Sequence, residues 1–323
     1  MEYSTLGRSG LRVSRLCLGT MNIGKLVDEE TSFAIFDTAI EAGINFVDTA
    51  DVYGGIGHRG RTEEFIGKWL SRGGGRREKI VLATKVYGKM GEGINERGLS
   101  AYHIRSACEA SLRRLKTDHI DLYQMHHIDR STPWNEIWSA MDQLLHAGKI
   151  TYMGSSNFAA WNIVEAQFTA RERNLGGLIS EQSLYNLTKR MVELEVIPAC
   201  REHGIGIIPW SPLAEGLLAG ILNDEKGVRK KTEAVQKALS QHRKQVEDYE
   251  TYCTSIGKRP EAVALAWLLK NPVISSVVIG SRTVEQVRGM VDALQTTLTD
   301  DEIQTVEAIW PGPGGEAPEA YAW

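Results

Sequence analysis

The sequence predicts an α/β protein in which eight parallel strands close into a (β/α)8 TIM barrel. Short β-branched runs alternate along the chain with amphipathic segments whose apolar residues recur at helical spacing. The short runs are apolar on both faces, which is typical of parallel strands covered by helices. Eight such units in a chain of 323 residues favour a closed barrel over an open sheet.

Eight segments carry the strand pattern, and a helical pattern follows most of them. The expected strands are RVSRLCLGT, from about residue 13, and then 45–49, 79–86, 119–126, 149–156, 177–184, 204–212 and 274–281. The expected helices are 28–43, 62–70, 101–115, 134–148, 162–174, 191–204, 261–271 and 283–294. Each helix can therefore cover a strand, as a barrel requires.

The main alternative fold is an open sheet made of two dinucleotide-binding halves. That fold should show G-x-G-x-x-G directly after its first strand. Here the corresponding turn reads LGTMNIG. The barrel is therefore the preferred prediction.

Three segments lie outside the repeating units. An N-terminal β-hairpin is expected before the barrel. The polar, basic stretch 223–245 is interpreted as an insertion after the seventh strand, partly helical and mobile. The Pro/Gly-rich stretch 311–323 is expected to be an irregular C-terminal extension. No linker divides the chain, so residues 1–323 are expected to form a single domain.

Composition points to small-molecule chemistry in a reducing compartment. The formal charge is −4, and basic residues are interleaved with acidic ones, so no electrostatic footprint for nucleic acid is present. The N-terminus MEYSTLGRSG lacks the apolar run of a signal peptide, and no stretch is apolar and long enough to cross a bilayer. The four cysteines form no C-x-x-C pair, which argues against disulfides and structural zinc and favours the cytoplasm: Cys17, Cys108, Cys200 and Cys253.

Polar residues fall at the ends of three neighbouring expected strands. Asp48 ends the second strand, Tyr53 follows in its loop, Lys85 ends the third, and His126 ends the fourth. In a barrel, such residues point into the active site. A tyrosine has a pKa of about 10, and a nearby cation such as Lys85 stabilises its phenolate. Asp48 would hold Lys85 charged, and His126 could donate a hydrogen bond to a substrate carbonyl oxygen.

Each of these residues also has an ordinary structural explanation. A strand-end aspartate is often a helix cap, a loop tyrosine often packs, and a lysine after a strand is often simply exposed. A rival reading makes His126, His127 and Asp129 metal ligands, as in hydrolases of this architecture. Adjacent residues at a strand end are expected to point in opposite directions, and no further His-x-His or carboxylate cluster completes a ligand set. No metal site is therefore predicted.

The chain resembles the aldo-keto reductase family over nearly its whole length. The segments that carry the resemblance are YSTLGRSGLRVSRLCLGTMNIG, FVDTADVYG, ATKV, IDLYQMH, GSSNF, EQSLYNL, IPWSPLAEGLLAG and VIGSRTVEQV, in the family's order. The resemblance implies a catalytic tetrad of Asp48, Tyr53, Lys85 and His126. It also implies hydride transfer from a nicotinamide cofactor, with Tyr53 as the general acid that completes reduction of a carbonyl.

The same resemblance implies a set of cofactor-binding residues. Those expected at the nicotinamide and its ribose are Ser156, Asn157, Gln182, Trp210, Gly19, Thr20 and Met21. Those expected along the pyrophosphate are Ser211, Pro212, Leu213, Gly216 and Leu218. Those expected around the adenosine 2′-phosphate are Gly280, Ser281, Arg282 and Gln286. A charge-assisted contact from Arg282, just before a helix N-terminus, favours NADPH.

Some of these assignments have alternatives. Trp210 would also serve as a core aromatic residue, and Ser156 and Asn157 as caps of the next helix. Many family members carry a Glu-Asn pair on the adenine where this chain has Gly289 and Met290, which leaves the preference between NADPH and NADH open.

The substrate is expected to be a small carbonyl compound bound by loops 87–103, 127–135 and 213–245. GRTEEFIGKWL, HHIDRSTPWNEIWSAMDQL and SEQSLYNL are similar to bacterial members that reduce nucleotide-linked 4-keto-6-deoxyhexoses. The rim residues that could meet a sugar or a diphosphate are His127, Asp129, Arg130 and Trp134. A second hypothesis is a nicotinamide-binding, redox-sensing regulatory subunit with slow turnover. The sequence does not indicate an oligomeric state.

Overall fold

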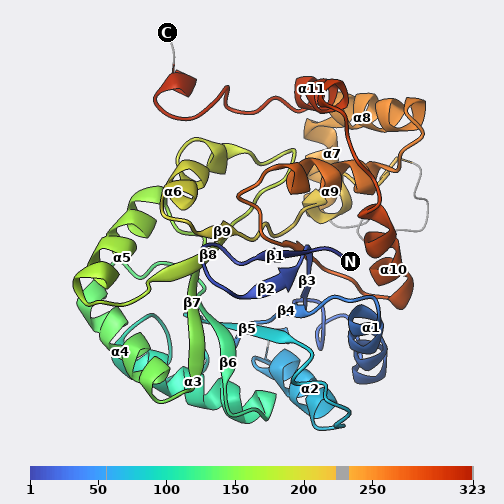
Figure 1. Cartoon of the computed structure of the whole chain (residues 1–323). Coiled ribbons are helices and arrows are strands. Elements are labelled where there is room, and N and C mark those ends of the chain that lie inside the picture. The colour runs from blue at the N-terminus through green and yellow to red at the C-terminus, as the bar shows by residue number, and fades with distance from the viewer. Residues whose placement is uncertain (56, 223–232, 322–323) are drawn as a thin grey trace.

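The computed structural model describes residues 1–55, 57–222 and 233–321. At its centre one curled sheet of eight parallel strands has the order β10-β3-β4-β5-β6-β7-β8-β9 (Figure 1). The strands are β3 (Leu16–Gly19), β4 (Phe46–Asp48), β5 (Val81–Val86), β6 (Ile120–Met125), β7 (Ile150–Ser156), β8 (Leu178–Gln182), β9 (Gly206–Ile207) and β10 (Val277–Ile279). All eight expected strand segments therefore contain a strand.

The two ends of this sheet meet and close the barrel. Ile207 of β9 forms a parallel bridge with Ile274, just before β10. Two residues past β9, the carbonyl oxygen of Pro209 accepts a hydrogen bond of 2.9 Å from the backbone N–H of Val278. The predicted (β/α)8 barrel is thus confirmed. A short bridge, and not a long ladder of hydrogen bonds, joins β9 to the segment of β10.

Helices cover the outside of the barrel, as Figure 1 shows. They are α1 (Glu29–Glu41), α2 (Arg61–Leu70), α3 (Ala101–Leu115), α4 (Trp134–His146), α5 (Ala160–Glu172), α6 (Val196–Glu202), α9 (Pro260–Lys270) and α10 (Val284–Ala293). The expected helix 191–204 is wrong in extent, because it divides into a 3-10 turn (Met191–Glu193) and α6. Pro198 lies in the first turn of α6, where a missing N–H is tolerated. In the interior of one long helix from residue 191, its ring would clash with the carbonyl group four residues earlier.

The first expected strand is also wrong in extent, since it divides into two. β2 (Arg12–Ser14) pairs antiparallel with β1 (Tyr3–Thr5), and β3 begins only at Leu16. The division is fixed by the Ser14 backbone N–H, which donates to Oδ1 of Asn45 at 2.7 Å instead of continuing the barrel ladder. The predicted N-terminal hairpin is confirmed, and it lies across one end of the barrel in Figure 1.

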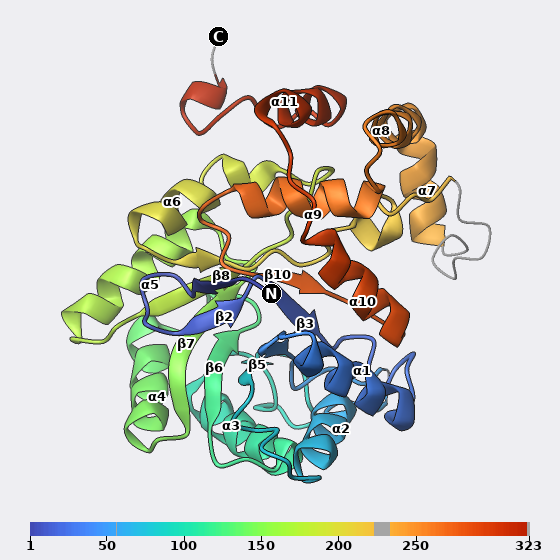
Figure 2. The ribbon, with the colours of Figure 1, turned by 45° about the vertical axis from the view of Figure 1, so that its right-hand side comes forward.

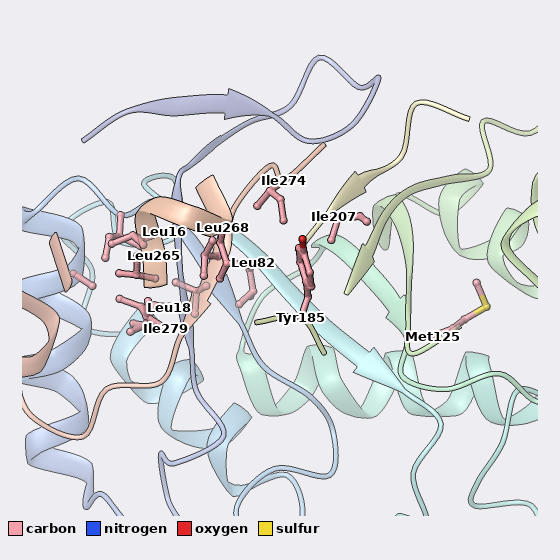
Figure 3. Close-up of a cluster of buried hydrophobic side chains, with 14 of the residues drawn as sticks. Leu16, Leu18, Leu82, Met125, Tyr185, Ile207, Leu265, Leu268, Ile274 and Ile279 are labelled. Atoms are coloured by element: carbon pink, nitrogen blue, oxygen red, sulfur yellow. The ribbon is translucent and has the colours of Figure 1, made fainter. Parts of the chain in front are cut away.

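The apolar core has two parts. The smaller part fills the barrel interior beneath the hairpin and includes Leu6, Cys17 and Phe46. The larger part lies between strands and helices, and in Figure 3 Leu16 of β3 gathers with Leu265 of α9. Neighbouring residues of a strand thus face opposite layers, as the two-residue repeat requires. Burial on both faces holds each strand in register and fixes which side chains reach the rim.

Further helices pack outside the barrel's helical ring (Figure 2). α7 (Glu233–Gln241) and α8 (Arg243–Ser255) occupy the C-terminal part of the expected insertion and continue beyond it, while residues 223–232 lie outside the described residues. α11 (Asp300–Ile309) was not expected from the sequence. After it, the described part of the C-terminal extension is irregular up to a 3-10 turn (Glu319–Tyr321), as expected.

None of the helices in the described ranges combines the length and the apolar character that a bilayer span requires.

Candidate active site

The predicted site residues lie on one rim of the barrel. The residues that end or closely follow successive strands, from β3 to β10, are Gly19, Asp48, Lys85, His126, Ser156, Gln182, Trp210 and Gly280. Because all eight strands are parallel, their carboxyl ends meet on the same face. The structure thus brings the polar strand ends together where a barrel places its chemistry.

A fully buried ion pair forms the base of this rim. Nζ of Lys85 lies 2.5 Å from Oδ2 of Asp48, with side-chain exposures of 0% and 3%. The ammonium also donates to the carbonyl oxygen of Thr49 at 3.0 Å. Burial lowers the pKa of Lys85, but Asp48 and Tyr53 more than offset this, so its pKa is raised overall. Lys85 is therefore a cation at neutral pH.

Tyr53 lies directly above this cation. Its hydroxyl is 3.5 Å from Nζ of Lys85, and the same Nζ lies 5.1 Å from the centre of the ring. The pKa of Tyr53 is nevertheless raised, because burial disfavours the phenolate more than Lys85 stabilises it. Tyr53 thus keeps its proton at neutral pH, with the Lys85 cation next to its hydroxyl.

His126 stands beside the tyrosine. The two rings meet edge to face, with centroids 5.8 Å apart. Burial, then Lys85 and His127, lower the pKa of His126 to about 2. The imidazole is therefore neutral over the whole physiological range and can act only as a neutral hydrogen-bond donor or acceptor.

The adjacent His127 does not point away from His126 as expected. The two rings stack at 5.2 Å with an interplanar angle of 8°, and Tyr87 meets His127 edge to face at 5.4 Å. His127 already lies in the loop beyond β6, where the strand's alternation no longer holds. The expectation that these two side chains point in opposite directions is therefore wrong. Within the described ranges, no three His, Cys, Asp or Glu side chains form a group that could hold a metal ion.

Two glutamines complete the environment of Asp48. Nε2 of Gln124 and Nε2 of Gln182 each donate to its Oδ1 at 2.9 Å, opposite the oxygen that binds Lys85. Sequence reasoning missed Gln124, although a buried amide two residues before His126 on the same face of β6 is a usable signal. It also missed the carbonyl of Thr49, which carries no side-chain signature.

A β-bulge aims Gln182 into the barrel. The β7–β8 pairing runs from Met153 with Leu178 to Gly154 with Ser180, so β8 carries one extra residue. Such a bulge moves every later side chain to the other face. The last rung of this ladder then places Ser156 and Gln182 opposite each other at the rim.

Ser156, Asn157 and Gln182 form one hydrogen-bonded group with Trp210. Oγ of Ser156 donates to the carbonyl oxygen of Gln182 at 2.8 Å, and Nδ2 of Asn157 donates to Oγ of Ser156 at 2.9 Å. Nε1 of Trp210 donates to Oδ1 of Asn157 at 3.1 Å. Asn157 adopts a positive φ of 59°, a conformation that asparagine tolerates and that is concentrated at functional sites. These residues offer amide and hydroxyl groups to a carboxamide and an indole face to a planar ring, so they fit a nicotinamide.

The expected ribose-side residues are differently exposed. Thr20 is buried, and its Oγ1 donates to the carbonyl oxygen of Asp48 at 2.9 Å. A Cβ on Gly19 would stand 2.4 Å from Cγ1 of Val278, so this position admits only glycine. Met21, by contrast, is 58% exposed and leaves its side chain open to a ligand.

The expected pyrophosphate segment follows β9. Ser211 has a positive φ of 53°, and its carbonyl oxygen accepts from Nδ2 of Asn186 at 2.8 Å. Leu218 has no exposed surface and packs in the larger part of the core, so the structure does not open it to a cofactor. Pro212, Leu213 and Gly216 lie in the same segment after β9, and Gly216 is the last residue of its 3-10 turn (Ala214–Gly216).

The expected 2′-phosphate residues surround the N-terminus of α10. Thr283 caps the helix, and the backbone N–H of Arg282 donates to Oε1 of Gln286 at 2.7 Å. Ser281 is buried, just after Gly280. A cation next to a helix N-terminus fits a phosphate monoester. In the same helix the carbonyl oxygen of Gly289 accepts from Arg259 at 3.1 Å, and Met290 is half-buried, so neither replaces the absent Glu-Asn pair.

Of the four rim residues considered for a sugar or diphosphate, two are engaged by contacts within the protein. The carboxylate of Asp129 accepts from the backbone N–H groups of Leu99 and Ser131. The Trp134 ring stacks on that of Trp138, with centroids 5.7 Å apart, and its Nε1 donates a hydrogen bond to Oε2 of Glu165 on α5. His127 and Arg130 remain exposed, with Arg130 above the Trp161 ring, so they are the better candidates for substrate contact.

The chain is similar to known proteins over nearly its whole length. A model of the Aldo/keto reductase family matches residues 15–311. The chain is 52% identical to the uncharacterized oxidoreductase YrpG of Bacillus subtilis (strain 168), over 100% of both chains. It is 35% identical to the versiconal hemiacetal acetate reductase of Aspergillus parasiticus, over 97% of this chain and 99% of that one. It is 34% identical to a probable voltage-gated potassium channel subunit beta of Oryza sativa subsp. japonica, over 96% of each.

Proposed function

The chain belongs to the aldo/keto reductase family, and from that premise we propose that it reduces a carbonyl compound to an alcohol with NADPH, with Tyr53 as proton donor. The observation that supports this most strongly is the buried chain from Asp48 through Lys85 to the Tyr53 hydroxyl, next to a neutral His126. The group fitted for a nicotinamide lies beside it on the same rim.

Each member of the tetrad has one task in this proposal. The nicotinamide, when bound, supplies the hydride that goes to the carbonyl carbon. Tyr53 gives its hydroxyl proton to the carbonyl oxygen, and Lys85 stabilises the phenolate that is left. Asp48 keeps Lys85 charged and in place, and neutral His126 donates a hydrogen bond to the same oxygen. One hydride and one proton together make the alcohol.

The second candidate is a redox-sensing regulatory subunit that holds the cofactor and turns over slowly. The relatives named as probable potassium channel beta subunits favour it, whereas those named as reductases favour the enzyme. Steady turnover of a generic aldehyde such as a nitrobenzaldehyde would support the enzyme. Tight cofactor binding with one slow turnover would support the sensor.

The cofactor preference is tested by titrating the protein with NADPH and with NADH. We expect NADPH to bind more tightly, and replacing Arg282 with alanine to weaken NADPH binding roughly 10- to 100-fold, because a hydrogen bond to a charged group is lost. NADH affinity should hardly change, since NADH has no 2′-phosphate. Equal losses for both cofactors would contradict the assignment of Arg282.

The pH dependence of turnover follows from the pKa values at the rim. The pKa of His126 is about 2, so the imidazole keeps its neutral form down to strongly acidic pH. The pKa of Tyr53 is raised, so the proton donor is lost only above about pH 10. We expect kcat for reduction, at saturating cofactor, to stay flat between about pH 5 and about pH 8. A loss of kcat as a group with an ordinary histidine pKa becomes protonated would contradict the neutral role of His126.

For the physiological substrate we propose a nucleotide-linked keto-deoxysugar. Support comes from the similarity of the rim segments and from Arg130, an exposed cation in the loop that follows β6. Incubation with such a sugar and NADPH should oxidise the cofactor. Turnover of simple aldehydes without any turnover of the sugar would retain the reductase and reject this substrate.

A further inference from the structure

A buried carboxyl group lies directly behind the residues fitted for the nicotinamide, and the proposed mechanism does not use it. Glu181 has no exposed surface. It pairs with Ser155 in the β7–β8 ladder, one rung before the pair Ser156 and Gln182. Because alternate rungs face opposite sides of a strand, Glu181 points away from the barrel interior when Gln182 points into it.

The carboxyl group of Glu181 joins the segments that carry those residues. Its Oε2 accepts from Oγ of Ser155, next to Ser156. Its Oε1 accepts from Oγ of Ser183 at 2.8 Å, next to Gln182. The same Oε1 accepts from the backbone N–H of Phe158 at 3.2 Å, next to Asn157. One carboxylate thus ties together the backbone on both sides of the nicotinamide group.

The ionised form suits this arrangement best. A carboxylate accepts all three hydrogen bonds, whereas the protonated oxygen of a carboxyl group must donate, which reverses one of them. Burial raises the pKa of Glu181 to about 7, with Ser155 and Ser183 opposing that rise. The carboxyl group is therefore balanced between its two forms at neutral pH.

The other ionisable groups around Glu181 do not change charge in that range. On α6, burial and the charge of Glu181 raise the pKa of the Cys200 thiol well above its ordinary value, so it stays neutral. Across β8, in the barrel interior, Lys85 remains a cation paired with Asp48. His126 remains neutral, since its pKa is about 2.

We propose that Glu181 is a positioning residue whose ionised form assembles the nicotinamide-binding group, so that cofactor affinity falls when Glu181 is protonated. The inference rests on the proposed function, because it assumes that the group at Gln182 binds a nicotinamide. The sign follows directly: the competent form is the carboxylate, so affinity is highest above about pH 7 and is lost as the pH falls through that value.

The first test is the affinity of the wild-type protein for NADH between about pH 8 and about pH 6. NADH is the probe because the 2′-phosphate of NADPH itself titrates near pH 6. If only the ionised form binds, the dissociation constant rises up to about tenfold over this range. Calorimetry at pH 7 in two buffers should also show release of roughly half a proton per NADH bound. A pH-independent affinity without proton release would overturn the proposal.

The second test compares variants of Glu181 with a matched control. Glu181→Gln should bind NADH at pH 8 at least as weakly as wild type does at pH 6, without a pH dependence. Glu181→Asp, which restores a carboxylate, should regain the pH dependence. The control Glu193→Gln removes another carboxylate that pairs with Arg190 at 2.7 Å, away from Ser155 and Ser183, and it should behave as wild type. Retention of the wild-type pH dependence in Glu181→Gln would overturn the proposal.

Kinetics separate this role from simple destabilisation. Glu181→Gln should raise the KM for the cofactor and leave kcat at saturation close to wild type, because the tetrad is untouched. A fall in kcat with an unchanged KM would contradict a positioning role. These tests distinguish a failure of this inference from a failure of the proposed function. A protein that binds neither NADH nor NADPH at any pH contradicts the proposed function, whereas pH-independent binding of NADH contradicts only the role of Glu181.

Discussion

Replacing Tyr53 with phenylalanine should lower kcat for carbonyl reduction by about 10²- to 10⁴-fold, the usual contribution of a general acid. The substitution removes only the hydroxyl group, which is the proposed source of the proton. Cofactor affinity should stay close to wild type, because Ser156, Asn157 and Gln182 hold one another without it. Steady-state assays of NADPH oxidation measure kcat, and fluorescence titration with NADPH measures the cofactor affinity separately.

The loss should not come from unfolding. The contact of the Tyr53 hydroxyl with Lys85 is long, 3.5 Å, so removing it costs little stability. Tyr123→Phe is the matched control, since that hydroxyl is buried on β6 and donates to the carbonyl oxygen of Ile104, away from the rim. Near-normal turnover of the Tyr53 variant would show that another group donates the proton.

The rim was predictable from sequence because a parallel barrel converts strand order into spatial proximity. Asp48, Lys85 and His126 lie at or within one residue of the ends of consecutive strands, and consecutive strands here are neighbours in the sheet. Knowing the strands was therefore enough to bring the residues together. Their pKa values were less accessible, because the raised pKa of Tyr53 depends on a balance between its desolvation and the charge of Lys85, which only the folded structure sets.

Features that depend on a one-residue shift in strand pairing were not predicted from the sequence. The extra residue in β8 decides that Gln182 faces the barrel interior and Glu181 faces away, and no turn signal in the apolar start of that strand marks it. The stacking of His127 on His126 was missed for a related reason, since the alternation rule was applied one residue beyond the strand's end.

The errors in the fold had local causes of a similar kind. The break before β3 depends on a contact between Ser14 and Asn45, which are distant in sequence. α11 could have been found, because Thr299 and Glu302 form a capping box directly before its apolar residues. Helices outside the barrel ring do not alternate with strands, so the repeating pattern that located the others did not predict them.

Replacing Lys85 with methionine should abolish turnover and also lower the free energy of unfolding. The variant leaves Asp48 as a buried carboxylate without its cation, and breaking a buried pair in this way typically costs about 3–5 kcal/mol. The amide groups of Gln124 and Gln182 still donate to Oδ1 of Asp48, so the lower end of that range is expected. Urea unfolding followed by fluorescence measures the loss.

The double variant Asp48→Asn with Lys85→Met separates stability from catalysis. Neutralising both partners removes the stranded charge, so much of the lost unfolding free energy should return. Turnover should not return, because nothing is then left to stabilise the Tyr53 phenolate. Recovery of turnover together with stability would mean that the ion pair only supports the fold. Recovery of stability alone would assign the cation beneath Tyr53 to the chemistry of the rim.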